Sequence, residues 1–160
     1  MSTQHYTQYG LEPLLHLDLE EDAEPIRFNV ILESKNDRTI LRYELPDSPG
    51  QDYISVIQNS MIEIKLIGDQ IFFSKEYDAI TTKEPLSSFY GGLIYDDYHQ
   101  ALDRYKKVLF KARYNVGGKL GTRHPFNINV DLLQSDETGA VKWIGLSIDP
   151  DIKNPPPKPT

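Results

Sequence analysis

The chain has 160 residues, no cysteine, 17 basic and 24 acidic side chains, and a formal net charge of −7. This length suits one domain, and the absence of cysteine excludes a disulfide scaffold, a Cys-ligated metal site and a thiol nucleophile. Uncharged runs such as Pro85 to Tyr95 reach 11 residues, whereas a membrane-spanning helix needs about 18. The composition therefore predicts a soluble, cytoplasmic protein with no membrane partner.

Residues 1–25 are predicted to form an acidic N-terminal arm, because they contain six acidic side chains and no basic one. The arm lacks the basic and apolar regions of a signal peptide. Leu15, Leu17 and Leu19 alternate with other residues, which predicts a first edge strand or a segment that lies on another subunit.

Residues 26–152 are predicted to form a single β-sandwich domain, because apolar residues there recur at every second position. Gly68 and Asp69 lie between two such runs and predict a hairpin over residues 61–74. The turn signals between the runs favour an antiparallel β-sandwich of about seven strands with at most one short helix. The alternating runs cover residues 26–33, 40–45, 61–67, 70–74, 126–132 and 141–148.

The segment over residues 97–114 fits two patterns. Its apolar spacing suits an amphipathic helix, but a helix would place Phe110 among lysines, whereas a strand would place Phe110 beside Val108 on one apolar face. We therefore expect a short helical turn over 97–104 and a strand over 107–116. Residues 153–160 are expected to form a proline-rich tail, which acts as an extended spacer.

The sequence indicates no catalytic residue, because it contains neither a nucleophile elbow nor a paired-histidine zinc motif. Two groups of residues are candidate metal ligands, although no cofactor is expected. One is the cluster of Asp96, Asp97, His99 and Asp103, for which a solvent-facing turn is the simpler interpretation. The other is a possible calcium site at the turn after the last strand, formed by Asp149, Asp151 and Asn154.

A glycine-rich loop follows the basic strand and suits the binding of a phosphate group. Its backbone amides can approach an anion, and two basic side chains add positive charge. The loop lacks the spacing of a P-loop, and a hairpin loop that joins two strands is the alternative. The candidate ligand-binding residues are Gly117, Gly118, Lys119 and Arg123 in this loop, with the aromatic residues Tyr95 and Tyr98.

Residues 104–124 contain seven basic side chains and no acidic one, and they follow the acidic block 76–103. The acidity of the whole chain argues against a nucleic-acid partner. The charge blocks instead predict a homodimer in which the arm of one copy covers the basic strand of the other. The candidate contacts are Glu20, Glu21 and Asp22 with Lys111 and Arg113.

The last third of the chain, from Lys107 to Pro155, resembles the bacterial inclusion-body protein superfamily of the AidA and PixA type and the related DP-EP family. The resemblance rests on a charged, aromatic strand (KKVLFKARYNV), a strand that begins Pro125-Phe126-Asn127, and a last strand that ends at Asp149-Pro150. It implies a bacterial, intracellular, self-associating β-sandwich and supplies no catalytic residues. Ile148 departs from the aromatic residue expected before the Asp-Pro pair, and the proline-rich tail is foreign to the pattern.

Three functional hypotheses follow from these observations. The favoured one is a non-enzymatic, self-associating β-sandwich protein with a structural or binding role. The second is a module that binds a small ligand, a carbohydrate or calcium through loop acids and aromatic residues such as Trp143. The third is an enzyme that recognises a nucleotide or phosphate through the Gly117–Arg123 loop.

Overall fold

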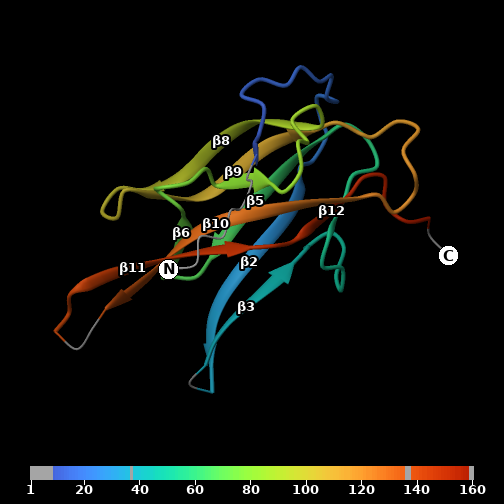
Figure 1. The fold of residues 1–160 in the computed structure, drawn as a ribbon. Helices are drawn as coiled ribbons and strands as arrows, with labels where there is room; N and C mark the ends of the chain where they lie inside the picture. The colour runs from blue at the N-terminus through green and yellow to red at the C-terminus, as the bar shows by residue number, and fades with distance from the viewer. Residues whose placement is uncertain (1–8, 37, 136–137, 159–160) are drawn as a thin grey trace.

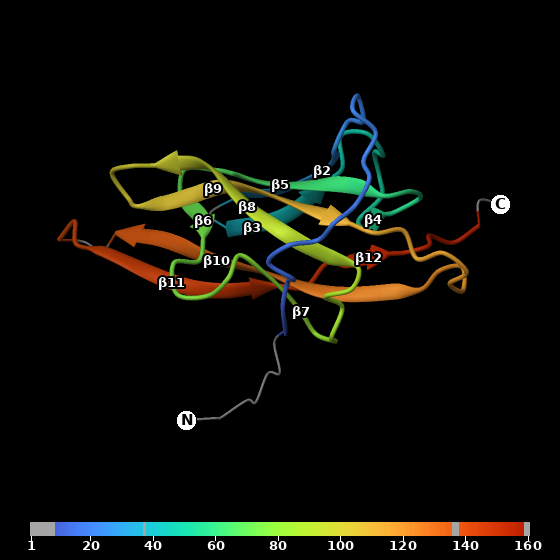
Figure 2. The ribbon, with the colours of Figure 1, turned by 90° about the horizontal axis from the view of Figure 1, so that it is seen from above.

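The structure is a computed structural model that describes residues 9–36, 38–135 and 138–158. Within these residues the protein is all-β, with twelve strands in two sheets, and no helix in this part of the chain could cross a membrane. The two sheets face each other as the layers of a sandwich (Figures 1 and 2). The seven-stranded sheet contains β1 (Tyr9–Gly10), β4 (Ile54–Ser55), β6 (Ile71–Phe73), β7 (Ile80–Thr82), β10 (Arg123–Ser135), β11 (Val141–Ile148) and β12 (Asp151–Lys153). The five-stranded sheet contains β2 (Ile26–Lys35), β3 (Arg38–Glu44), β5 (Ser60–Ile67), β8 (Tyr90–His99) and β9 (Arg104–Ala112).

The predicted all-β class is confirmed. Seven of the strands in the described residues have seven residues or more, and the other strands are short segments that complete the seven-stranded sheet. Most neighbouring strands are antiparallel, but β2 pairs with β5 in parallel, as does β12 with β4. A parallel pair needs a long crossover connection, and β3 and β4 lie between β2 and β5 in the chain.

Residues that alternate along the long strands fill the space between the two sheets. A side chain at every second position points to the same face of a strand, so one face of each strand can be apolar throughout. Burial of each large apolar side chain contributes about 1.5–3 kcal/mol to the stability of the fold. The buried set includes Phe28, Val30, Ile62, Ile64 and Leu66, then Val108 and Phe110, and from the other sheet Ile71, Phe73, Phe126, Ile128 and Val130.

The hairpin predicted over residues 61–74 is wrong. β5 and β6 belong to different sheets, and β6 pairs with β10 instead. The chain changes sheets at Gly68, whose φ is 132° and whose position leaves no room for a side chain, since a Cβ there would lie 2.8 Å from the carbonyl oxygen of Leu32. Gly68 and Asp69 therefore mark a crossing between the two layers.

The helical turn predicted over residues 97–104 is also wrong. β8 continues to His99 and residues 100–103 make a tight turn, after which β9 begins at Arg104. The ring of Tyr105 packs at 4.9 Å from Tyr98 and 5.2 Å from Tyr95. Cross-strand aromatic contacts of this kind stabilise a sheet, and they favour the strand over the amphipathic helix. The strand that we expected over 107–116 is β9, which spans Arg104–Ala112.

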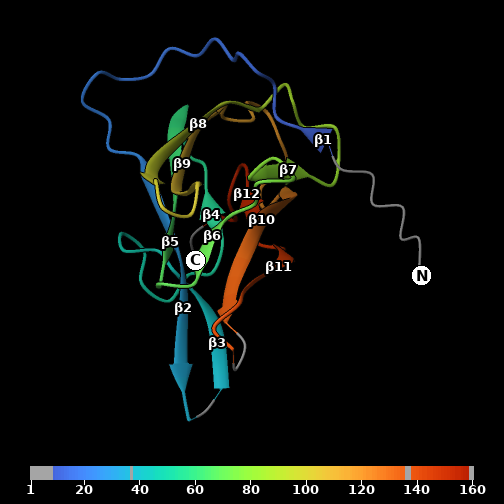
Figure 3. The ribbon, with the colours of Figure 1, turned by 90° about the vertical axis from the view of Figure 1, so that its left-hand side faces the viewer.

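Residues 9–25 of the predicted arm pack on their own chain and arch over β8 (Figure 3). β1 pairs with β7, and the amide of Gly92 in β8 donates a 2.8 Å hydrogen bond to the carbonyl of Glu12. Leu15 is buried at 7% exposure. A Cβ at Gly91 would lie 2.6 Å from the oxygen of Glu12, so the close approach of the arm depends on glycine at this position.

The basic strand contacts the arm through backbone atoms. Lys111 Nζ donates to the carbonyl of Leu15, and Arg113 Nη2 donates to the carbonyl of His16, both at 3.3 Å. The acidic residues predicted to bind this strand, Glu20, Glu21 and Asp22, lie exposed at a turn. Lys111 and Arg113 thus contact the arm of the same chain through its backbone carbonyls and not through the carboxylates of Glu20, Glu21 and Asp22. The pairing of these residues between two copies of the chain stays a prediction.

The predicted tail begins within the sheet. Lys153 is the last residue of β12, and the next residue, Asn154, is fully buried. The Asn154 side chain donates to the carbonyl of Arg113 at 2.8 Å and accepts from the amide of Asn115 at the same distance. The beginning of the tail is therefore an integral part of the domain.

Candidate functional site

A hollow of about 560 Å³ lies on the outer face of the seven-stranded sheet. The loop after β6 and the tip of the β8–β9 hairpin border the hollow, and β10 and β11 form its floor. The β8–β9 and β10–β11 hairpins project from the same end of the molecule (Figure 2). Polar and charged residues dominate the lining, which consists of Ser74, Lys75, Glu76, Tyr77, Arg104, Asn129, Val130, Asp131, Trp143, Gly145, Leu146 and Ser147.

The floor of the hollow follows from the alternation along β10. Ile128 and Val130 point into the core, so Asn129 and Asp131 point to the opposite face. Three successive pairs of residues across β10 and β11 define the direction of the hollow: Asn129 with Ser147, Asp131 with Gly145, and Leu133 with Trp143. Each step of two residues advances about 7 Å along a strand, so the pairs span about 14 Å.

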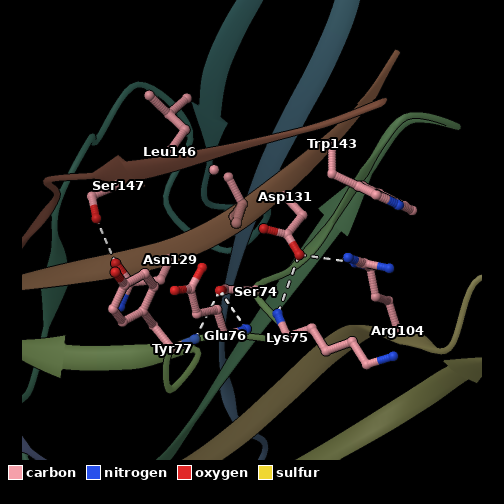
Figure 4. Close-up of a pocket in the computed structure, with 12 residues that line it drawn as sticks. Ser74, Lys75, Glu76, Tyr77, Arg104, Asn129, Asp131, Trp143, Leu146 and Ser147 are labelled. Carbon is pink, nitrogen blue, oxygen red and sulfur yellow. Dashed lines mark hydrogen bonds and ion pairs between the residues drawn. The ribbon is translucent and has the colours of Figure 1, made fainter. Parts of the chain in front are cut away.

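The loop after β6 places three exposed side chains beside this floor. Ser74 Oγ accepts hydrogen bonds from the amides of Glu76 at 3.2 Å and Tyr77 at 3.0 Å, which fixes a tight turn. The amide of Ser74 donates to the carbonyl of Asn129 at 2.9 Å. The turn is therefore attached to β10, and the side chains of Lys75, Glu76 and Tyr77 are exposed around the hollow (Figure 4).

Arg104 reaches the hollow from the first position of β9. Its Nε donates to Asp131 Oδ2 at 2.8 Å, and its Nη1 donates to the carbonyl of Leu102 at 3.0 Å. The guanidinium lies 3.5 Å from the centre of the Trp143 ring, a cation–π contact. Because both side chains of the Arg104–Asp131 pair are only 12% exposed, the guanidinium is held in a fixed orientation. Phe72 packs edge-to-face against Trp143, with 5.8 Å between the centres of the two rings.

A second hollow of about 270 Å³ adjoins the first on the other side of Lys75 and Tyr77. Lys75 Nζ donates to Asp103 Oδ2, and Tyr98 Oη donates to Asp103 Oδ1, both at 2.5 Å. The hydrogen bond from Lys75, followed by that from Tyr98, lowers the pKa of the Asp103 carboxyl. The hydrogen bond to this carboxylate in turn raises the pKa of Tyr98. Asp103 is therefore held as a carboxylate beside Lys75.

Of the aromatic residues predicted to bind a ligand, Tyr95 lines the second hollow and Tyr98 contacts Asp103 at its edge. The hydroxyl of Tyr95 accepts a hydrogen bond from the amide of Ala79 at 3.0 Å. Burial raises the pKa of this hydroxyl. Tyr95 therefore has a structural partner in addition to any ligand.

The predicted glycine-rich loop lies at the opposite end of the sandwich from the hollow (Figure 2). It connects β9 in one sheet to β10 in the other, so it is a crossing between layers and not a hairpin. Gly117 and Gly121 have positive φ angles of 75° and 82°. Lys119 is exposed, and Arg123 forms an ion pair with Asp151 at 2.9 Å. The structure brings these loop residues together but places them far from Tyr95 and Tyr98.

The three residues of the predicted calcium site have separate partners. Asp149 forms an ion pair with Lys83 at 3.3 Å, Asp151 pairs with Arg123, and the buried Asn154 side chain bonds to backbone groups and to the Tyr90 hydroxyl. The described residues contain no group of three acidic or histidine side chains placed to hold a metal ion. The predicted cluster of Asp96, Asp97, His99 and Asp103 is therefore not arranged as a metal site. Calcium binding at Asp149, Asp151 and Asn154 stays a prediction.

Sequence reasoning missed Lys75, Tyr77, Arg104 and Asp131 as a group. In the sequence, Arg104 is one of seven basic residues in the block 104–124, and Asp131 lies within the alternating run 126–132. The sequence feature that could have indicated this site is the composition of the polar face of β10. Asn127, Asn129 and Asp131 replace the lysines and glutamates that a solvated strand carries, and the structure buries all three.

The chain was compared with models of known protein families. The family model described as "predicted novel nucleotide synthetase" matches residues 1–157. The search of curated proteins gives no match. The family match covers the arm, both sheets and the first residues of the tail, so it applies to the whole sandwich.

Proposed function

The chain belongs to the family of predicted novel nucleotide synthetases, and from this membership we propose that it is an enzyme that binds its nucleotide substrate in the hollow between β11 and the β8–β9 hairpin. The single observation that carries this proposal is the set of side chains in the hollow. Two basic side chains, two aromatic rings and carboxylates lie together there, and these groups can recognise the phosphate, base and sugar of a nucleotide.

The phosphate groups bind at the end of the hollow formed by Lys75 and Arg104. The Arg104 guanidinium is oriented by Asp131 and Trp143, and guanidinium donors match the geometry of phosphate oxygens. The side chains of the Lys75–Asp103 pair are 57% and 56% exposed. An exposed pair contributes at most about 1 kcal/mol, so Lys75 can exchange Asp103 for a phosphate at little cost.

The base stacks on Tyr77 at the other end of the hollow. The Tyr77 side chain is 59% exposed and lies on the side of Asn129 and Ser147 (Figure 4). Stacking of a base on an aromatic ring contributes about 1–3 kcal/mol and tolerates any base. Stacking alone therefore does not select a base, and any preference for one base depends on hydrogen bonds between the edge of the base and the protein.

The glycine-rich loop is the second candidate for the phosphate site. Its positive φ glycines and the exposed Lys119 suit an anion. The hollow is favoured because the exposed ring of Tyr77 lines it, whereas none of the exposed tyrosines among the described residues belongs to the loop.

Titration with the four ribonucleoside triphosphates tests the proposal. Trp143 is the only tryptophan in the chain, and its contact with Arg104 makes its fluorescence sensitive to a phosphate bound there. We expect a saturable fluorescence change with at least one nucleotide, and formation of a new nucleotide product detectable by chromatography and mass spectrometry.

Paired variants separate the two candidate sites. Lys75→Ala should weaken binding about tenfold, because a hydrogen bond to a charged group is lost. The matched control Lys119→Ala removes an exposed lysine of the glycine-rich loop and should leave the affinity unchanged. Weaker binding by the Lys119 variant alone would move the site to the loop, and no binding at millimolar nucleotide by the unmodified chain would contradict the proposal.

A further inference from the structure

The two oxygens of Asp131 have different surroundings. All hydrogen bonds to this side chain from the described residues go to Oδ2, from Arg104 Nε at 2.8 Å and the amide of Lys75 at 3.2 Å. The other oxygen points away from both donors (Figure 4). Asp131 is therefore fixed by one oxygen, which leaves Oδ1 as an acceptor at the floor of the hollow.

Gly145 keeps the hollow open above Asp131 Oδ1. These two residues are paired across β10 and β11, and a Cβ built at Gly145 would meet only Asp131 Oδ1, at 3.9 Å. A larger side chain at this position would cover the oxygen. Asp131 is only 8% exposed, so the access of a ligand to its carboxylate depends on the small residue at position 145.

Asp131 occupies the middle of the hollow. The pair Asn129–Ser147, beside Tyr77, lies one step of about 7 Å along the strands in one direction, and Trp143 with Arg104 lies one step in the other. In a nucleotide the ribose lies between the base and the phosphates. A base on Tyr77 and phosphates at Arg104 therefore place the ribose over Asp131.

We infer that Asp131 Oδ1 accepts a hydrogen bond from the 2′-hydroxyl of the ribose, so that the protein binds ribonucleotides in preference to 2′-deoxyribonucleotides. This inference rests on the proposed function. A carboxylate accepts hydrogen bonds and donates none, and an acidic side chain recognises the ribose 2′-hydroxyl in dinucleotide-binding folds. The 2′-hydroxyl is on the carbon next to the base-bearing carbon, and we assign Oδ1 to this hydroxyl and not to the 3′-hydroxyl.

The test compares the dissociation constants of a ribonucleoside triphosphate and its 2′-deoxy and 3′-deoxy analogues, measured by calorimetry and Trp143 fluorescence. The tightest-binding base is used throughout. We expect the 2′-deoxy analogue to bind about tenfold more weakly or worse, since a site built to bond a hydroxyl rejects the ligand that lacks it. The 3′-deoxy analogue should bind as the ribonucleotide does.

Two variants of Gly145 identify Asp131 as the acceptor without breaking its ion pair with Arg104. Gly145→Leu should cover Oδ1 and reduce the ratio of the two dissociation constants to about one. Gly145→Ala leaves an ordinary contact and should keep the discrimination. Circular dichroism of both variants checks that the sheet is retained, and Asp131→Asn is a third variant expected to reduce the ratio.

The outcomes separate this inference from the proposed function. Equal binding of the ribo and 2′-deoxy forms, or tighter binding of the deoxy form, would overturn the inference and leave nucleotide binding in place. Discrimination that persists unchanged in both Gly145→Leu and Asp131→Asn would also overturn it. Binding of no triphosphate at all would overturn the proposed function and the inference together.

Discussion

Tyr90, His124 and Asn154 form a buried polar group inside the sandwich. Asn154 Nδ2 donates to the hydroxyl of Tyr90 at 3.1 Å, so the tyrosine proton goes to His124 Nδ1 at 2.6 Å. This arrangement requires a neutral histidine whose Nδ1 is an acceptor. Burial lowers the pKa of His124 and raises the pKa of Tyr90, so both side chains are uncharged at neutral pH.

The His124 side chain makes the stability of the fold depend on pH. Below about pH 6.5 the histidine of the unfolded chain takes up a proton, while His124 in the folded chain, whose pKa is lowered by burial, takes one up only at lower pH. The unfolded state then binds more protons, so the free energy of unfolding decreases as the pH falls, by at most about 1.4 kcal/mol per pH unit. Urea unfolding at intervals between pH 7.5 and 5.5 measures this slope.

The variant His124→Gln should lack this part of the pH dependence. The matched control is His16→Gln, which removes an exposed histidine of the arm and should keep the slope of the unmodified chain. Equal slopes for His124→Gln and the unmodified chain would show that the buried group does not exclude the proton.

At the scale of an element, the packing of the arm against β8 depends on one glycine in that strand. A Cβ at Gly91 would approach the oxygen of Glu12 to 2.6 Å and Cβ of Leu15 to 3.0 Å. Gly91→Val should therefore displace the arm from β8 and expose Leu15. We expect faster cleavage of the arm in limited proteolysis, with the sheets themselves still folded by circular dichroism.

Gly10→Ala is the matched control for the arm. It lies in β1, at the start of the described arm, and its Cβ would make an ordinary contact of 3.5 Å with Asp78. The rate of proteolysis should not change in this variant. An equal rate for Gly91→Val would mean that β1 and the basic strand hold the arm without the close approach at β8.

At the scale of the whole molecule, the predicted homodimer depends on how the arm is shared. The arm contacts its own chain through carbonyls of Leu15 and His16, and such contacts can be exchanged between two identical copies. We expect a dimer by light scattering at low and high salt, and a monomer for a chain that begins at Ile26. A monomeric full chain at every salt concentration would contradict self-association and weaken the predicted similarity to inclusion-body proteins.

The alternation of apolar residues predicted the all-β class and much of the core from sequence alone. In a strand the two faces are set by position, so Phe28 and Val30, or Ile128 and Val130, must share a face wherever the strand lies. The same alternation predicts that Phe110 lies in the core, whichever strands pair with its own. These features are local, and therefore a single sequence determines them.

The pairing of strands and the composition of the hollow were decided only by the tertiary structure. Gly68 and Asp69 suit a turn in either case, and it is the pairing of β6 with β10 that takes the chain to the other sheet. Lys75, Arg104 and Asp131 are far apart in sequence, and each has an ordinary local context. They meet because the β8–β9 hairpin reaches over β6 to the outer face of β10, and no periodicity along the chain records such a contact between distant segments.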